Sequence, residues 1–229
     1  MNFEFYHTYN RGVEKRNIFL DEQDYFRGVH DLYEFNDTNA TTNLNYRSRS
    51  AIDLGPRTEK RTRDLLIDLF AWVFIPNHYH CFQCGRAEKG IPKFQQKWGG
   101  GYTNYFNLKY ERNGVLFQGK YKRVHVTNDA QAGHLVCYIH SNPLDLWKPN
   151  WKEKGLTAFE LQNALEFLEK KYHWSSHQDC LGIKNFPSLI NTEFLFKFFG
   201  GYQGYRKFFL DWLKQYDRNI GLIQKFTLE

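Results

Sequence analysis

The chain has few cysteines, no long apolar run and only a mild excess of positive charge. Four cysteines in 229 residues are too few for a disulfide scaffold. No apolar run approaches the ~18 residues that a membrane span needs, and the first twelve residues lack the basic start and apolar stretch of a secretory signal. Hydrophobic residues make up 41% and aromatic residues 18%, which excludes wholesale disorder. We therefore expect a soluble, cytoplasmic protein that does not insert into membranes and is built around one core.

Positive charge is concentrated in residues 86–123. Nine Lys and Arg residues stand there against two Glu residues, a net charge of +7, whereas the whole chain carries +6. Eight aromatic residues lie among these charges. Cations that hold phosphates and rings that stack on bases favour a nucleic-acid surface. The alternative stays open, because several of these rings recur every three or four residues, as on the core face of a helix with solvated lysines.

A second basic segment, residues 47–63, carries six basic residues against Asp53 and Glu59 and is rich in Ser, Thr, Gly and Pro. This composition predicts a loop insertion between two ordered elements. The loop is either a solvated insertion or a segment that follows a phosphate backbone.

Hydrophobic periodicity predicts an α+β fold in which strands and helices alternate. The predicted strands cover residues 3–12, 65–75 and 115–126, and the predicted helices cover 21–35, 91–109 and 129–142. The apolar run of the second strand resumes beyond Pro76–Asn77, so we expect one strand to continue through a bend there. Beyond residue 150 the pattern becomes helical and aromatic. We therefore predict a domain over 1–150 and a helical C-terminal extension over 151–229.

Two histidines and a tyrosine–asparagine pair are the candidates for chemistry. On a strand, His78 and His80 project from one face, where two imidazoles can bind a metal ion. On a helix, Tyr138 and Asn142 lie one turn apart. Asn142 could then complete a nitrogen, nitrogen, oxygen metal site with Tyr138 beside it as a nucleophile. Since a phenol has a pKa near 10, it needs electrostatic help to attack at neutral pH.

These residues and their surroundings resemble the HUH single-tyrosine transposases, and among them the REP-associated tyrosine transposases (the IS200-like superfamily). The resemblance rests on five segments in order: YNRGVEKRNIF (9–19), WVFIPNHYHCF (72–82), YTNYFNLKYERNGVLFQGKYK (102–122), YIHSNP (138–143) and YHWSSHQDCLG (172–182). Two positions depart from the family pattern, because Tyr79 stands where an aliphatic residue is more common and Lys120 where Arg is. Neither change removes a proposed ligand or the nucleophile, although Tyr79 could alter how the histidine pair is set.

The resemblance implies a ferredoxin-like antiparallel sheet flanked by helices. It implies cleavage of single-stranded DNA near a hairpin, in which Tyr138 forms a 5′-phosphotyrosine and strands are then rejoined. Mg²⁺ or Mn²⁺ would bind His78, His80 and Asn142, and no organic cofactor would be needed. The protein would be a monomer or homodimer associated with the nucleoid. The candidate DNA-contacting residues are Arg11, Lys97, Lys109, Arg112, Lys120, Lys122 and Arg123.

Three alternatives compete with this interpretation. One is a zinc site, since Cys81 and Cys84 lie beside the two histidines, but on a strand Cys81 faces away from them. Another is a domesticated hairpin-binding protein with little cleavage, and the third is a replicative or conjugative nickase. Cys137 and Cys180 are expected to be buried small hydrophobes. The WSSH stretch matches the family, and capping by Ser175 or Ser176 is its simplest explanation.

Overall fold

The fold is built on an antiparallel sheet, which confirms the predicted α+β class. The computed structural model describes residues 4–40, 63–216, 219 and 221. In the described chain the sheet has four strands in the order β2-β3-β1-β4. Their bounds are β1 (Phe5–Arg11), β2 (Ile67–Ile75), β3 (His78–Gly85) and β4 (Lys122–Val126). Each neighbouring pair is antiparallel, and the basic segment 47–63 lies outside the described residues except for Arg63.

The segment around Pro76–Asn77 is a tight hairpin turn. Ile75 pairs directly with His78, so β2 and β3 are two strands joined by two residues. The expectation of one strand continuing through a bend was therefore wrong. Both strands are buried along nearly their whole length, so neither has the apolar–polar alternation that would have marked where one strand stops. The turn places His78 at the first position of β3.

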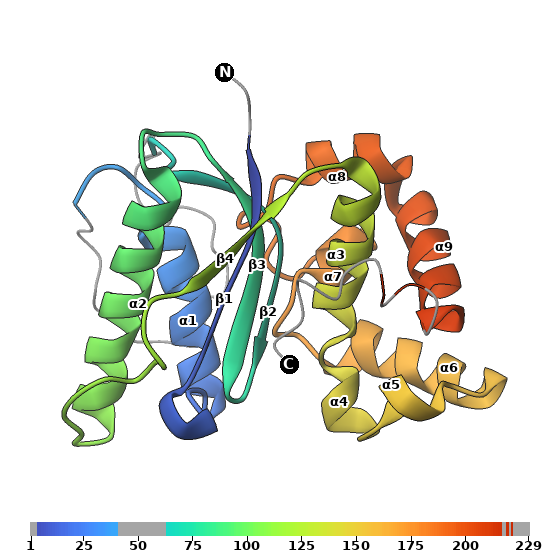
Figure 1. Cartoon of the computed structure of the whole chain (residues 1–229), viewed down its shortest axis with the longest axis horizontal. Coiled ribbons are helices and arrows are strands. Elements are labelled where there is room, and N and C mark those ends of the chain that lie inside the picture. The colour runs from blue at the N-terminus through green and yellow to red at the C-terminus, as the bar shows by residue number, and fades with distance from the viewer. Residues whose placement is uncertain (1–3, 41–62, 217–218, 220, 222–229) are drawn as a thin grey trace.

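Helices cover both faces of the sheet. Figure 1 shows α1 and α2 on one side of the sheet and α3 with the C-terminal helices on the other. The bounds of the three central helices are α1 (Glu22–Glu34), α2 (Gly90–Lys109) and α3 (Asp129–Ser141). The side chain of Asp21 caps α1 and that of Asn128 caps α3, each accepting a hydrogen bond from a backbone N–H three residues on.

The three glycines of α2 do not break the helix, and one of them is required by packing. A Cβ atom on Gly101 would lie 2.4 Å from the ring of Phe35, which follows α1. Gly101 therefore lets α1 and α2 approach closely. The same side of α2 buries Trp98, Tyr102 and Phe106, so the helical spacing of those rings marks the core, as the alternative interpretation of this segment held.

The strand predicted over 115–126 is shorter than expected, because β4 begins only at Lys122. Leu116 and Phe117 are buried in an irregular segment, with Phe117 bridged to Gly12. Gly119 then has a φ of +144°, a backbone angle that side-chain-bearing residues rarely adopt. This residue interrupts the extended chain ahead of β4.

The C-terminal part is helical, as predicted, and packs on the outer edge of β2. Its elements are α4 (Leu144–Trp147), α5 (Trp151–Lys154), α6 (Ala158–Glu166), the π-helical turn η3 (Phe167–Lys171), α7 (His177–Cys180), α8 (Thr192–Phe199) and α9 (Gly201–Lys214). The backbone N–H of Phe74 donates to Trp174, and that of Ser176 donates to Trp72. None of the helices in the described part of the chain is long and apolar enough to cross a membrane. The domain boundary near residue 150 stays a prediction.

Candidate functional site

The two histidines of the HxH motif lie on the face of the sheet that is covered by α3. Successive residues of β3 alternate between faces, and Tyr79, between them, points the other way. The Tyr79 hydroxyl donates to Gln95 of α2 at 2.7 Å, and its ring packs against Trp98. The unusual tyrosine thus belongs to the α2 side of the core. His78 and His80 are both buried, with ring centroids 5.0 Å apart.

His80 is held from one side by a third histidine. Its Nδ1 lies 2.8 Å from Nε2 of His7 on β1, and its Nε2 is a buried atom with no hydrogen-bond partner among the described residues. Burial, together with the neighbouring imidazoles, Lys152 and Arg11, holds the pKa of His80 well below its ordinary value. The ring is therefore neutral, and a neutral imidazole is the form that binds metal ions.

His78 is held between the hairpin turn and the end of α3. Its Nδ1 lies 2.6 Å from Oδ1 of Asn77, and it forms a side-chain hydrogen bond with Asn142. Burial, followed by the positive charge of Arg11, lowers the pKa of His78 to about 3; the bond to Asn142 opposes the shift and Lys152 adds to it. This second imidazole is neutral as well.

Helix α3 brings Tyr138 and Asn142 to these histidines. Asn142 keeps helical backbone angles (φ −51°, ψ −39°) although a proline follows it. Its Nδ2 donates to the carbonyl of Tyr138 at 2.7 Å. The ring of Tyr138 meets that of His80 edge to face at 5.5 Å between centroids. The four residues expected to form the site are thus brought together, at the end of the sheet where the β2–β3 turn lies beside α4 and α5 (Figure 1).

The donor set fits a divalent cation. Two neutral imidazoles and one amide are available, and one imidazole nitrogen is buried without a partner. Nitrogen and oxygen ligands of this kind suit Mg²⁺ less well than Mn²⁺, although both bind amide oxygens. No cluster of three or more His, Cys, Asp or Glu side chains suited to a metal occurs among the described residues; the candidate site instead combines two histidines with an asparagine.

Two functional candidates were missed by sequence reasoning. Lys152 of α5 places its ammonium 5.9 Å from the ring centroid of Tyr138 and is fixed by Asp145 at 2.7 Å. His7 supports His80, as described above. The alternation of β1 could have assigned His7 to a face, but only the pairing of β1 with β3 puts it beside His80. No local signal marks Lys152.

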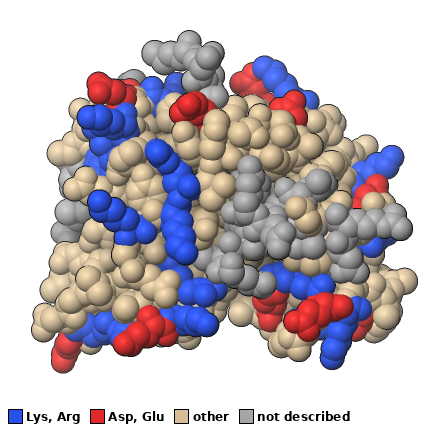
Figure 2. Space-filling model, in the orientation of Figure 1, with Lys and Arg blue, Asp and Glu red and all other residues tan. Residues whose placement is uncertain are grey.

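Exposed positive charge gathers at β4 and the loop before it. Lys120, Lys122 and Arg123 are all exposed. The Arg123 guanidinium lies 4.6 Å from the ring centroid of Tyr6, and the Lys122 ammonium lies 5.9 Å from that of Tyr9. Figure 2 shows Lys and Arg side chains with few acidic neighbours over the middle of the face in front of β4 and α2. These three candidate phosphate contacts therefore share one surface.

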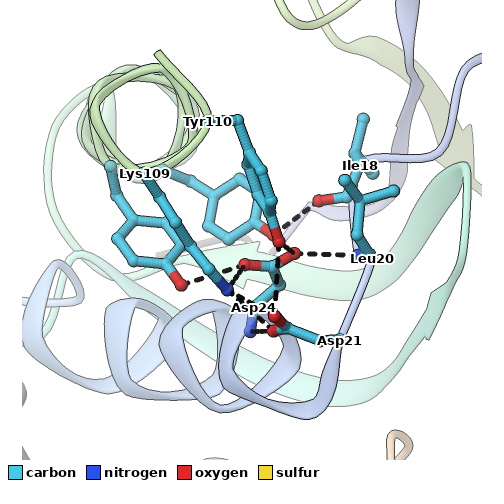
Figure 3. A network of polar contacts seen from close by, with 8 residues as sticks. Ile18, Leu20, Asp21, Asp24, Lys109 and Tyr110 are labelled. Atoms are coloured by element: carbon cyan, nitrogen blue, oxygen red, sulfur yellow. Dashed lines mark hydrogen bonds and ion pairs between the residues drawn. The ribbon is translucent and has the colours of Figure 1, made fainter. Parts of the chain in front are cut away.

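The remaining basic candidates are tied to the protein itself. Lys109 forms ion pairs with Asp21 and Asp24 at 2.8 and 2.7 Å, inside the network of Figure 3. Lys97 donates to the carbonyls of Asp37 and Asn39 beyond α1. Arg112 and Arg11 are listed separately in space: the first lies over the ring of Phe106, and the second is paired opposite His78 at the candidate site. Of these, Arg11 alone is close to the histidine pair.

The cysteines do not complete a zinc site. Cys81 is fully buried on the opposite face from the histidines, and Cys84 is four residues from His80, roughly 13 Å along the strand. Burial raises the pKa of the Cys84 thiol to about 11 and that of Cys81 further. Cys137 and Cys180 are buried, as predicted.

The WSSH stretch joins three elements. The Ser176 hydroxyl accepts from the backbone N–H of Trp72 at 2.9 Å and bonds His140 of α3 at 2.8 Å. His140 also bonds the hydroxyl of Tyr205 in α9 at 2.7 Å. Ser176 makes no side-chain cap of α7, so the capping explanation is wrong for Ser176. Ser175 accepts a bond from the N–H of His177 at 3.3 Å.

Comparison with known proteins gives one remote structural likeness. No protein-family model and no curated protein matches the sequence. Three chains of solved structure match. One is described as "Structure of the REP associates tyrosine transposase bound to a REP hairpin"; it is 17% identical, with a TM-score of 0.39, and the match covers 63% of this chain and 68% of that one. So remote a likeness carries no conclusion about function, which must come from the geometry of the site.

Proposed function

We propose that the protein cleaves and rejoins single-stranded DNA at hairpins, as a metal-dependent HUH single-tyrosine transposase. The observation that carries the proposal is the meeting of β3 and α3. One helical turn brings Asn142 to His78 and the Tyr138 ring to His80 at 5.5 Å. A nucleophile beside two imidazoles and an amide is the arrangement that phosphoryl transfer by a tyrosine requires.

In this proposal Tyr138 supplies the attacking oxygen. Its Oη forms a bond to phosphorus as it loses its proton, and the bond from phosphorus to the 3′ oxygen breaks. The 3′ oxygen takes up a proton and leaves as a free hydroxyl. The 5′-phosphotyrosine conserves the phosphodiester energy, so a second 3′-hydroxyl can reverse the step and join strands.

The surrounding residues supply neutral ligands and positive charge. Bound Mg²⁺ or Mn²⁺ at His78, His80 and Asn142 would neutralise phosphate charge and polarise the scissile phosphate. Lys152, held by Asp145 near the Tyr138 ring, favours the negatively charged phenolate. The exposed charges at β4 would contact DNA phosphates, and a protein acting on such DNA would be associated with the nucleoid.

The test is covalent capture of labelled hairpin oligonucleotides with single-stranded flanks, in Mn²⁺, on denaturing gels. We expect a shifted protein–DNA band for the wild type and none for Tyr138→Phe, because the phenol oxygen is the group that bonds to phosphorus. Tyr202→Phe is the matched control: Tyr202 is 46% exposed on α9, so the band should persist.

A covalent band that survives Tyr138→Phe would refute the assignment of the nucleophile. If a broad hairpin set gives no band while native gels show tight binding, a hairpin-binding protein without cleavage replaces the transposase. Loss of the band on adding a chelator, with return on adding Mn²⁺, is the expected sign of metal dependence.

A further inference from the structure

A second imidazole backs the candidate metal ligand His80. His7 and His80 are both 0% exposed, and their rings are nearly parallel, at 13° with centroids 5.0 Å apart. Nε2 of His7 lies 2.8 Å from Nδ1 of His80. Because one hydrogen lies between two neutral rings, one nitrogen donates it and the other accepts it.

The sheet register creates this contact. Tyr9 pairs with His80 across the β1–β3 ladder, and His7 pairs with Phe82. His7 is thus the diagonal neighbour of His80 on the face toward α3. Tyr9 stacks on His7 at 4.8 Å, so the supporting ring is held on its strand.

Two proton arrangements are possible, and they have opposite consequences for a cation. If His80 carries its hydrogen on Nδ1 and donates to His7, its partnerless Nε2 presents a lone pair. If His7 donates instead, Nε2 of His80 carries the hydrogen and presents N–H, which repels a cation. A metal-binding histidine is commonly fixed in the correct form by the group that bonds its other nitrogen.

We propose that His7 is a positioning residue: it accepts the Nδ1 hydrogen of His80 and thereby directs the Nε2 lone pair of His80 to the divalent ion. The inference rests on the metal site of the proposed function. It assigns His7 no contact with DNA or with the metal. Its role is to fix which nitrogen of His80 binds and how the ring is oriented.

Two substitutions separate this role from simple packing. In His7→Gln the terminal amide oxygen reaches about as far as Nε2 and can accept the same hydrogen. In His7→Phe the ring shape is kept and the acceptor is lost. A packing role predicts that Phe replaces His better than Gln does, whereas the positioning role predicts the reverse order.

The first readout is Mn²⁺ affinity without DNA, measured by titration with electron paramagnetic resonance of free Mn²⁺. We expect His7→Phe to weaken binding by about 10- to 100-fold, as loss of such a support commonly does, and His7→Gln to retain most of the affinity. Thr8→Val is the control, because Thr8 lies on the same strand and bonds Gln83 and Gln95 on the opposite face. It should perturb the sheet and leave Mn²⁺ affinity nearly unchanged.

The second readout needs no variant that must fold. Long-range ¹H–¹⁵N correlation spectra of the metal-free wild type identify the protonated nitrogen of His80, after assignment with His80→Gln. Hydrogen on Nδ1 supports the proposal. Hydrogen on Nε2, an affinity order in which Phe exceeds Gln, or a wild type that binds no Mn²⁺ would each overturn it.

Failure of the proposed function gives a different result. If Mn²⁺ binds with the expected order of affinities but no covalent DNA band forms, the metal site and the role of His7 stand and the cleavage proposal falls.

Discussion

Asp24 of α1 is the residue at which a change of one charge should cost the most stability. Its carboxylate is completely buried and accepts four hydrogen bonds, all between 2.7 and 2.9 Å. The donors are the backbone N–H of Leu20, the hydroxyls of Tyr105 and Tyr110, and the ammonium of Lys109. Figure 3 shows these groups converging from α1 and α2. The carboxylate thus joins the two helices that cover one face of the sheet.

The change Asp24→Asn keeps the side-chain volume and removes the charge. The amide can accept at Oδ1, but its Nδ2 then faces groups that donated to the carboxylate. Breaking a buried ion pair by neutralising one partner costs about 3–5 kcal/mol. For a domain of this size, each kcal/mol lowers Tm by about 2–4 °C, so a fall of about 6–20 °C is expected.

The measurement is urea unfolding with thermal unfolding monitored by circular dichroism. Asp21→Asn is the control: Asp21 also pairs with Lys109 but is 51% exposed, and Asn caps a helix as well as Asp does. It should cost about 1 kcal/mol or less. If Asp24→Asn is no more destabilising than Asp21→Asn, the buried carboxylate does not hold the helices together and the reasoning is refuted.

Two further predictions follow from the charges and the buried histidines. Replacing Lys122 and Arg123 with Gln should weaken hairpin-DNA binding in fluorescence anisotropy and reduce the salt slope by about 0.7 for each lost phosphate contact on a single strand, whereas Lys197→Gln, on α8 and paired with Glu193, should leave the slope unchanged; an unaltered slope in the β4 variant would contradict the assignment. Burial, with a smaller contribution from Arg206, lowers the pKa of His177 to about 3. The unfolded chain therefore takes up a proton below pH 6.5 that the folded chain refuses, and the stability present above that pH falls by about 1.4 kcal/mol at pH 5.5. Urea unfolding of His177→Gln should show a shallower loss between pH 6.5 and 4.5, and identical pH slopes would refute the assignment.

Local patterns predicted most of the elements but not the limits of the strands. The caps Asp21 and Asn128 and the helical spacing of apolar residues placed α1, α2 and α3 correctly. The β2–β3 turn was missed because both strands are covered on two faces, and a continuous apolar run carries no period. The start of β4 was misplaced because Leu116 and Phe117 are buried through tertiary contacts of an irregular segment.

The candidate site divides in the same way. Spacing alone put His78 and His80 on one face and put Tyr138 and Asn142 on one helix face. Sequence could not reveal His7, because its contact depends on the register between strands about seventy residues apart. Nor could it show that Lys109 is committed to Asp21 and Asp24, since an ion pair between α1 and α2 leaves no mark on either segment.

The closure of the β2 edge has a consequence for self-association. Residues 174–176 bond to the backbone of β2, as do Asn36 and Asn191 at its near end. A strand whose outer groups are already paired offers no template to another chain. Of the described strands, this leaves β4 as the exposed edge, and its Lys122 and Arg123 would face the same charges on a second copy. Charged residues on a sheet edge discourage strand addition, so the surface proposed to attract DNA would also keep the sheets of neighbouring molecules apart.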